Sequence, residues 1–499
     1  MTSLVALDGR EVRTAHEEIA EVLIVGSGPA GATVARQLSA LGVRVVVVEE
    51  GHEARTASPS GLQAMAELYR DMGTSIAFGN ASMPYLQGRV VGGTSVINGA
   101  ISWQLPREAV DAWLQRDPAL GEALDWSALQ KDEAWILERL HVTPTEDAVA
   151  GEKNRLLGQG AEALGVAHRP IQRNVLGCRG SGRCLQGCPH GAKLSMDSSF
   201  LPDAVTAGAR ILSGARVERV LVEGGRAVGV RGVFTGGGAF TLRASHAVVL
   251  AASAIQTPVL LLASGLTQGP VGRHLTAHPG VSVTGKFPHA VRNWEGATQG
   301  HEVTGYRAEG LKLEALGFDR SILSSRVPGV GPAFGARLHE LERYAVWGAA
   351  MKARAEGRVR RGWRRPLVTY SLTPEDVRLA RRGVRVLADV LLAAGATEVY
   401  PGLPGFDPVI TTREHAARIE EVGSLNPRDY TMSMTHLFGT ARMGRDAREN
   451  VVRPDFRHHH VDGLYVADSS VFPTNLGVNP QISIMMLASR CAAFVHSRK

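Results

Sequence analysis

The chain is poor in cysteine and has no long apolar run, and each shortage excludes a class of protein. Cysteine accounts for only 4 of the 499 residues, which excludes the disulfide framework typical of small secreted proteins. No stretch reaches the roughly 18 consecutive apolar residues that a membrane-spanning helix needs. We therefore expect a globular chain that is long enough for two domains.

A targeting signal is also missing from the start of the sequence. The first twenty residues, MTSLVALDGREVRTAHEEIA, have neither a basic start with an apolar core nor a twin-arginine motif. We expect a cytoplasmic protein, and export together with a partner subunit stays open. In that reducing compartment the cysteines would be thiols or metal ligands rather than disulfides.

The net charge of +7 is modest for this length, but positive charge gathers between Lys352 and Arg385. One interpretation is an anionic partner or a membrane surface. The favoured alternative is a solvated helix face. Only Trp363 interrupts the segment RVRRGWRRP, which lacks the interleaved aromatic residues of a single-strand binder. We expect no nucleic acid partner, and membrane association only through a partner protein.

What the sequence does contain is a dinucleotide-binding pattern near its start, EVLIVGSGPAGATVARQLSALGVRVVVVEEG. An apolar strand over 22–25 leads into a G-x-G-x-x-G turn and an Ala-rich helix. Such glycines permit a tight turn, close approach of a pyrophosphate and close packing of helix on strand. The helix N-terminus supplies free N–H groups to the phosphates. The three glycines are Gly26, Gly28 and Gly31.

An acidic residue ends the second strand of this pattern. Residues 45–48 are four valines, and Glu49 follows them. A carboxylate at this place accepts hydrogen bonds from the hydroxyls of an adenosine ribose. The segment predicts a dinucleotide site without distinguishing NAD from FAD. Glu50 and His52 are expected to be exposed loop residues.

Three later stretches favour FAD. GRVVGGTSVINGAISW, at 88–103, is a glycine-rich loop whose N–H groups can face a phosphate or a flat ring. VVLAASAIQTPVLLLASGL, at 248–266, predicts a buried strand followed by a helix. Near the C-terminus, a strand over 464–467 ends at Asp468, where the ribityl and pyrophosphate of an extended FAD would lie.

In their order along the chain these motifs resemble the glucose–methanol–choline (GMC) oxidoreductase family of flavoproteins, and the resemblance covers nearly the whole chain. The G-R-V-x-G-G-[ST]-S-x-x-N loop is matched at 88–98 and the A-x-A-I-x-[ST]-P segment at 252–258. The H-x-x-G-T-x-R-M-G motif is matched at 436–444, and D-x-S-x-x-P-T-x-x-x-x-N-P at 468–480. The resemblance implies an FAD-dependent alcohol dehydrogenase or oxidase, in which a hydride passes from a CH–OH carbon to flavin N5.

The resemblance also implies an α/β fold in which a Rossmann-type FAD-binding domain is interleaved with a substrate domain built on a six-stranded antiparallel sheet. The FAD-binding domain is expected to be discontinuous, over 15–110, 195–280 and 431–499. Residues 111–194 would form a connecting region that holds the cysteine-rich segment, and 281–430 would form the substrate-binding domain.

Cofactor contacts carry over to matching positions of this sequence. Ile97 stands where some relatives attach FAD covalently to a histidine, so the resemblance implies non-covalent FAD. Positions matched to the surroundings of the pyrophosphate and isoalloxazine are Arg89, Gly92, Gly93, Thr94 and Asn98. Positions matched to the adenine and to further flavin contacts are Val217, Asp468 and Pro480.

Alcohol oxidation requires a base for the hydroxyl proton and a second group that fixes the substrate oxygen. His436 is the candidate base and Asn479 the candidate partner, because relatives place His and His, or His and Asn, at these positions. Asn479 and Pro480 are expected to be the N-cap and first residue of a helix. The positive end of that helix would face the flavin pyrimidine.

Three of the four cysteines crowd into CRGSGRCLQGCPHGAK, at 178–193. Cys178, Cys184 and Cys188 suit a [3Fe–4S] cluster, or a [4Fe–4S] cluster with an unusual fourth ligand. The spacing resembles the catalytic subunits of bacterial FAD glucose dehydrogenases, and a related segment occurs in long-chain alcohol and sterol oxidising relatives. Structural thiols in a glycine-rich loop are the alternative.

Three functions therefore stay open at this stage. The first is FAD-dependent oxidation of a small-molecule alcohol, with electrons passed on through an iron–sulfur cluster. The second is the electron-transferring catalytic subunit of a sugar dehydrogenase complex, which needs an acceptor protein. The third is a flavoprotein that catalyses no net oxidation.

Overall fold

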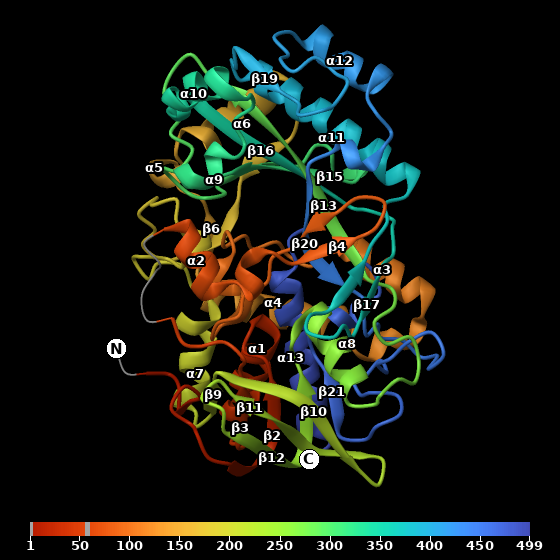
Figure 1. Cartoon of the computed structure of the whole chain (residues 1–499). Coiled ribbons are helices and arrows are strands. Elements are labelled where there is room, and N and C mark those ends of the chain that lie inside the picture. Colours follow the sequence, from red (N-terminus) through yellow and green to blue (C-terminus); the bar gives the residue numbers. More distant parts are fainter. Residues whose placement is uncertain (1–2, 55–59) are drawn as a thin grey trace.

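Two sheets, each with its own hydrophobic core, divide the molecule into a lower and an upper half (Figure 1). This computed structural model describes residues 3–54 and 60–499. The lower half contains both ends of the described chain, and the middle of the sequence forms most of the upper half. The chain therefore crosses between the halves more than once, as the predicted interleaving requires.

The lower sheet is mostly parallel and has eight strands within the described ranges. Where its central parallel strands lie side by side they are apolar, at residues 22–25 of β2, throughout β3 and at residues 247–250 of β12, because a parallel sheet is buried on both faces. β2 and β3 are neighbours, paired from Val22 opposite Val45 to Val25 opposite Val48. Its strands are, in spatial order, β1 (Leu7–Asp8), β9 (Arg210–Ser213), β3 (Val45–Val48), β2 (His16–Val25), β12 (Ala239–Leu250), β11 (Arg226–Phe234) and β10 (Ala215–Glu223), with β21 (Leu464–Val466) also paired to β12.

Helices cover the lower sheet. α1 packs against α7 and α13, while α8 lies against β10. This half confirms the predicted Rossmann-type pattern of strand, turn, helix and strand. The helices are α1 (Pro29–Ala40), α7 (Phe200–Thr206), α8 (Ser253–Ala263) and α13 (Gln481–Ser497), with α3 (Arg107–Arg116) and α4 (Trp126–Arg139) at the side.

The upper sheet is antiparallel throughout and has seven strands in the described part of the chain, rather than the predicted six. Two strands, β7 and β20, come from outside the predicted range 281–430. β20 pairs with the first half of β13 and β19 with the second half. The strands are β19 (Glu398–Tyr400), β13 (Thr276–Lys286), β16 (Tyr344–Met351), β15 (Leu311–Leu316), β14 (His301–Val303), β7 (His168–Pro170) and β20 (Met432–Phe438).

The long helix α11 covers the upper sheet together with α6. Its start is a capping box, in which Thr373 and Asp376 bind each other's backbone N–H groups. The helices of this half are α5 (Asp147–Ala150), α6 (Glu152–Ala163), α9 (Arg320–Ser324), α10 (Gly331–His339), α11 (Pro374–Ala393) and α12 (Arg413–Val422).

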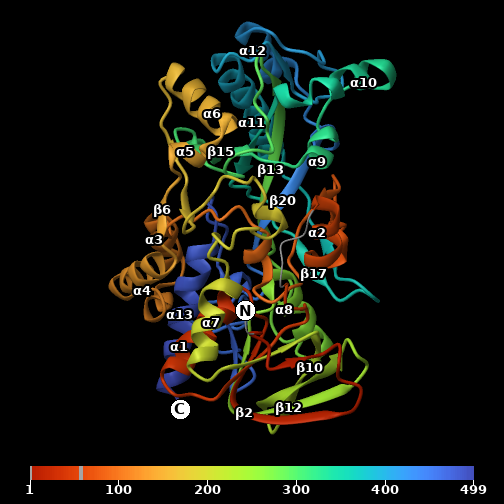
Figure 2. The ribbon, with the colours of Figure 1, turned by 90° about the vertical axis from the view of Figure 1, so that its left-hand side faces the viewer.

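Smaller elements lie between the halves. A four-stranded sheet consists of β17 (Arg358–Arg360), β18 (Leu367–Thr369), β4 (Ile76–Phe78) and β5 (Met83–Pro84), and a two-stranded one of β6 (Val142–Pro144) and β8 (Gln172–Asn174). α2 (Gly61–Leu68) lies beside them on the same side of the molecule as β17 (Figure 2). Among the described residues, no helix combines the length and apolar character that a membrane span requires.

Candidate active site

A cavity of about 940 Å³ is lined by residues of both halves. It brings together segments that the sequence holds far apart, from the first glycine turn to the start of the last helix. The predicted site residues that line it are Gly26, Gly28, Glu49, Gly93, Thr94, Asn98, Val217, His436, Asp468, Asn479 and Pro480.

Three predicted cofactor residues do not line this cavity: Gly31, Arg89 and Gly92. Gly31 packs the helix on the turn, since a Cβ there would lie 1.9 Å from the carbonyl oxygen of Gly26. Gly92 donates its backbone N–H to the hydroxyl of Ser27 over 3.0 Å. The flavin contact of Arg89 stays a prediction.

The glycine turn and the glycine-rich loop meet at the cavity. Their backbone geometry there shows whether the pyrophosphate of a dinucleotide would fit. Gly93 has a φ of +58°, and a Cβ on it would lie 2.8 Å from Cα of Gly28. Any side chain would therefore push apart the two backbones that approach each other here. A cradle lined by bare backbone is what a pyrophosphate requires, so these residues fit FAD.

Glu49 occupies the predicted ribose position. Its Oε2 accepts hydrogen bonds from the backbone N–H and hydroxyl of Ser27 at 3.0 and 2.7 Å, and its Oε1 from the N–H of Gly51 at 2.7 Å. Burial raises the pKa of Glu49 in spite of these donors. The bonds fix the carboxylate at the cavity wall, where its remaining lone pairs can accept ribose hydroxyls.

The sequence predicts that Glu50 and His52 are exposed loop residues, and this prediction is wrong. Glu50 lines the cavity and forms a 2.7 Å ion pair with Arg70. His52 is half-buried and pairs with Val90 of the glycine-rich loop through a β-bridge. His52 therefore joins the first strand–turn unit to the glycine-rich loop, and Glu50 joins it to the turn at Arg70; neither contact can be seen in the sequence.

Asp468 lies where β21 ends and is almost fully buried. Its Oδ2 accepts from the N–H of Ser253 and the hydroxyl of Thr257, at 3.0 and 2.5 Å. Burial raises its pKa. The predicted strand followed by an acid is confirmed, and this acid also ties the start of α8 to the cavity.

Val217 lies at an irregularity of β10. The pairing of β10 with β11 shifts between Val217 and Arg219, so the strand bulges beside the cavity. A bulge leaves backbone groups unpaired, and such groups are available to an adenine edge.

His436 and Asn479 face each other inside the cavity. Asn479 Nδ2 lies 3.4 Å from His436 Nε2. Removal from water, and after it the positive charge of Lys312, lower the pKa of His436 to about 3. His436 is therefore neutral at physiological pH, which is the state that a proton acceptor needs.

A second histidine orients the first. His278 Nδ1 lies 3.0 Å from His436 Nδ1, and His278 Nε2 accepts a 2.8 Å hydrogen bond from the N–H of Gly477. Burial keeps the pKa of His278 well below its ordinary value. The proton of neutral His278 thus lies on Nδ1 and points at His436, which favours the His436 tautomer with its own proton on Nε2.

Lys312 is a functional residue that sequence reasoning missed. Its ammonium group donates to Asn479 Oδ1 and to Glu314, and Glu302 Oε2 lies 3.1 Å away. Only 1% of Lys312 is exposed. Because the amide oxygen of Asn479 is held by Lys312, its Nδ2–H group is turned toward His436 and the cavity.

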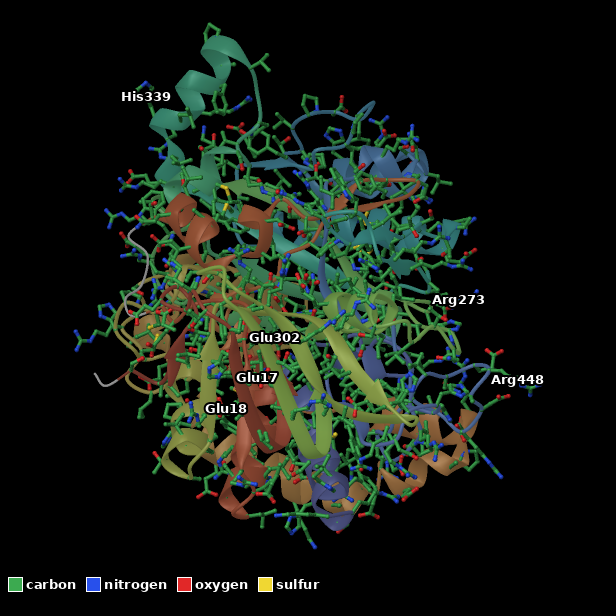
Figure 3. All side chains as sticks on the ribbon, turned by 60° about the horizontal axis from the view of Figure 1, so that its bottom comes forward. Glu17, Glu18, Arg273, Glu302, His339 and Arg448 are labelled. Atoms are coloured by element: carbon green, nitrogen blue, oxygen red, sulfur yellow. The ribbon has the colours of Figure 1, made fainter. Side chains whose placement is uncertain are left out.

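Lys312 itself is held in place by a buried network. Glu302 accepts from the indole N–H of Trp103 at 2.7 Å and from Arg169 at 2.8 Å, and Figure 3 shows Glu302 over the interior of the ribbon. Lys312 and Glu314 share one face of β15, and Glu302 pairs with Glu314 across the sheet. The alternation of leucine with charge in LKLEAL was the signal that could have revealed them.

The last helix begins one residue later than predicted. α13 starts at Gln481, Pro480 is its N-cap residue, and no side chain caps it. Asn479 does not act as a cap because Lys312 engages its side-chain oxygen. Both Asn479 and Pro480 nevertheless line the cavity, so the N-terminus of α13 points at it as expected.

The iron–sulfur prediction finds no support in the structure. The guanidinium of Arg173 contacts Cys178 Sγ at 3.6 Å and Cys184 Sγ at 3.3 Å, so an arginine stands where a cluster would bridge these sulfurs. Within the described ranges no three His, Cys, Asp or Glu side chains are grouped to hold a metal ion, Cys188 included. The residues present do not fit a cluster.

The cysteine-rich segment has a structural role instead. Burial raises the pKa of Cys184, but Arg173, Lys193 and a bond from Thr298 outweigh it, so the net pKa lies below the ordinary value. Lys193 donates to the carbonyl oxygens of Val96, Asn98 and Cys184, at 2.6, 3.1 and 2.8 Å. The cysteine-rich segment thereby supports the glycine-rich loop from behind.

Comparison with known proteins gives consistent relationships. The N-terminal and C-terminal models of the GMC oxidoreductase family match residues 22–280 and 353–488. An uncharacterised GMC-type oxidoreductase of Mycobacterium tuberculosis is 37% identical over 94% of this chain and 74% of its own length. A long-chain-alcohol oxidase of Arabidopsis thaliana is 30% identical over 94% and 66%. The solved structure of pyridoxine 4-oxidase from Mesorbium loti superposes with a TM-score of 0.73, at 18% identity, over 96% and 99% of the two chains.

Proposed function

Because this chain belongs to the GMC oxidoreductase family, we propose that it uses FAD to oxidise an alcohol to a carbonyl compound, with His436 as the base and Asn479 as its partner. The observation that carries the proposal is the placement of these two side chains 3.4 Å apart in one cavity with the dinucleotide cradle. When bound, FAD supplies the hydride acceptor.

The remaining chemistry belongs to this chain's own residues. Asn479 Nδ2–H donates to the substrate oxygen, since Lys312 holds the other end of the carboxamide. The low pKa of His436 keeps its imidazole neutral, and in the tautomer whose Nε2 carries no proton the ring takes the hydroxyl proton at Nε2. Glu49, Gly93 and Asp468 bind and orient the cofactor along the wall of the cavity.

The contact with His278 sets a condition on this proton transfer. If His278 keeps its proton on Nδ1, His436 presents Nε2–H, and the site then offers two donors to one oxygen. Two donors stabilise an alkoxide. Proton removal at Nε2 requires the other His436 tautomer, and the variants that separate the two roles are given in the Discussion.

We propose an alcohol with an apolar chain as the substrate class. The long-chain-alcohol oxidase of Arabidopsis thaliana carries such a substrate in its name, and the lining of the cavity includes many apolar side chains. The side chains involved are Val259, Leu316, Phe318, Met432, Met434 and Leu437. Apolar walls retain alkyl chains through the hydrophobic effect.

An anaerobic flavin-reduction screen tests the proposal. Purified protein with bound FAD is mixed with alcohols of increasing chain length, with sugars and with a sterol, and bleaching of the flavin absorbance is followed. We expect bleaching by long-chain primary alcohols. Bleaching by sugars alone would replace the proposed substrate class with that of a sugar dehydrogenase, and no bleaching by any alcohol would contradict the function.

Electron transfer through an iron–sulfur cluster is not part of the proposed function, because Arg173 stands between two of the thiols. We expect anaerobically purified protein to contain less than one iron and one acid-labile sulfide per three chains, with an absorbance spectrum of flavin alone. Stoichiometric iron and sulfide would show that the segment 178–193 rearranges around a cluster. Reoxidation with oxygen, compared with an artificial acceptor, then identifies the electron acceptor.

A further inference from the structure

The positive run between Lys352 and Arg385 divides into two parts in the structure. On α11 three of the four arginines form ion pairs: Arg378 lies 3.1 Å from Glu375, Arg382 lies 2.9 Å from Glu309, and Arg385 pairs with Asp389. This part is the solvated helix face that the sequence favoured. The hairpin that joins β17 to β18 is different.

On that hairpin most arginines lack a counter-ion. Arg365 lies 3.6 Å from Asp71. Four further arginines have no salt-bridge partner among the residues that the structure describes: Arg358, Arg360, Arg361 and Arg364. The guanidinium of Arg364 lies 4.5 Å from the ring centroid of Trp363, and Trp363 is 91% exposed. One exposed apolar side chain needs no explanation, but a larger patch of exposed apolar side chains marks an interaction site.

The small sheet that carries this hairpin has two faces. One face is buried, and the other is exposed although its side chains are apolar. Ala77 of β4 and Val368 of β18 are fully buried and pair with each other. Because side chains alternate along a strand, their neighbours Ile76, Phe78 and Leu367 point outward, and Phe78 is 53% exposed. Parallel pairing places Leu367 beside Ile76.

These side chains form one patch, which we call the rim patch. It combines exposed apolar residues with the four unpaired arginines of the hairpin. Its apolar members are Met72, Ile76, Phe78, Leu86, Trp363 and Leu367. Few other large apolar side chains gather in this way on the described surface; Val330, for example, stands alone before α10.

The rim patch lies at the cavity. Leu86 and the hairpin tip, residues 361–366, belong to its lining. The base of the hairpin is anchored, since Val359 N–H donates to Gly272 over 2.7 Å. In Figure 2 the teal hairpin beside the label β17 projects from the side of the molecule.

We propose that the rim patch docks on an anionic phospholipid bilayer, so that an apolar alcohol enters the cavity directly from the lipid. Tryptophan favours the membrane–water interface, and arginine binds lipid phosphates while its alkyl stem lies on apolar surface. An acidic protein surface would pair with the arginines, but it would not bury the apolar outer face of the sheet or the projecting indole. The inference rests on the proposed function for the substrate, whereas docking itself is measured without turnover.

Co-sedimentation with lipid vesicles tests the proposal on the full chain with bound FAD. Vesicles of phosphatidylcholine alone are compared with vesicles that also contain phosphatidylglycerol, at low and physiological salt. We expect binding to the anionic vesicles, weakened by salt. R361S/R364S should bind about thirtyfold more weakly, since each arginine near an anionic surface adds about 1 kcal/mol. W363S should bind about tenfold more weakly.

Matched controls separate the patch from general charge or hydrophobicity. V330S removes an apolar side chain that is 86% exposed, and R231S/R448S removes two arginines elsewhere. Arg448 stands at the edge of the molecule in Figure 3, and both controls should bind vesicles as the unaltered protein does. Flavin absorbance and Tm show that each variant is folded.

Two results would overturn the proposal. One is equal vesicle binding by W363S, R361S/R364S and the unaltered protein. The other is binding to heparin that is lost in R361S/R364S but unchanged in W363S, together with no binding to anionic vesicles, which would mark the surface as a site for an acidic macromolecule. Neither result depends on whether an alcohol reduces the flavin.

Discussion

His436→Ala is expected to keep bound FAD but to slow flavin reduction by a long-chain alcohol by about 10²- to 10⁴-fold, the range that a positioned base contributes. The hydrogen-bond partners of His436 are His278, Thr435 and Asn479 rather than the glycine turn or Glu49, so the cradle for the cofactor retains its contacts. Stopped-flow measurement of flavin bleaching without oxygen gives the rate constant, and the absorbance of the purified variant gives the FAD content.

His436→Gln is the matched variant that separates the two roles of this side chain. Glutamine keeps an N–H donor of similar reach but cannot accept the hydroxyl proton. If His436 is the base, the Gln and Ala variants lose the same large factor. If the Gln variant retains a rate within tenfold of the unaltered enzyme, His436 acts as a donor to an alkoxide, as the His278–Gly477 hydrogen bond favours.

Lys312→Met should slow flavin reduction by about 10- to 100-fold, because Asn479 loses a charged partner worth roughly 1.5–3 kcal/mol. The pH dependence gives a more specific signature. Burial is the main cause of the pKa of about 3 at His436, and the charge of Lys312 adds to it, so the unaltered enzyme should keep its rate as pH falls from 8 to 5. Removal of the neighbouring cation raises the pKa of His436 while burial still holds it down, so the rate of the variant should begin to fall at a higher pH than that of the unaltered enzyme.

Lys286→Met is the control for that experiment. Lys286 also forms ion pairs, with Glu340 and Glu398, whereas Lys312 binds Asn479 of the candidate site. Its variant should keep the pH profile of the unaltered enzyme. Lys312→Met leaves Glu302 and Glu314 without their cation, which can destabilise the fold by about 3–5 kcal/mol. K312M/E302Q removes one of these charges. An unchanged pH profile in the folded double variant would contradict the role of Lys312.

Most of the cofactor half could be predicted from the sequence because its signals are local. A strand, a glycine turn, a helix and a terminal acid follow one another within about thirty residues, and Gly26, Gly28 and Glu49 line the cavity as expected. The parallel strands read as unbroken apolar runs because both of their faces are covered. His436 and Asn479 could be named from the family motifs, although their distance could not.

The rest depended on contacts between distant segments. Lys312 contacts Asn479, which lies 167 positions further along the sequence, and neither local segment predicts this contact. Contacts close in sequence can also escape prediction: Cys178, Cys184 and Cys188 have a spacing that suits a cluster, yet Arg173, five residues before Cys178, lies between two of the sulfurs. The spacing of residues along the chain shows only that they are near in sequence, whereas a metal site requires that their side chains converge in space.

The sequence by itself determined the family, the cofactor-binding pattern and the residue types of the candidate catalytic pair. A glycine turn, or a strand that ends in an acidic residue, is specified by a few adjacent residues. Only the tertiary structure decided which arginines of the positive run form ion pairs. Most of those on α11 do, whereas most of those around Trp363 do not. The reason is physical: charge and exposure are properties of a surface, and a surface is assembled by register and packing between strands that the sequence separates by hundreds of residues.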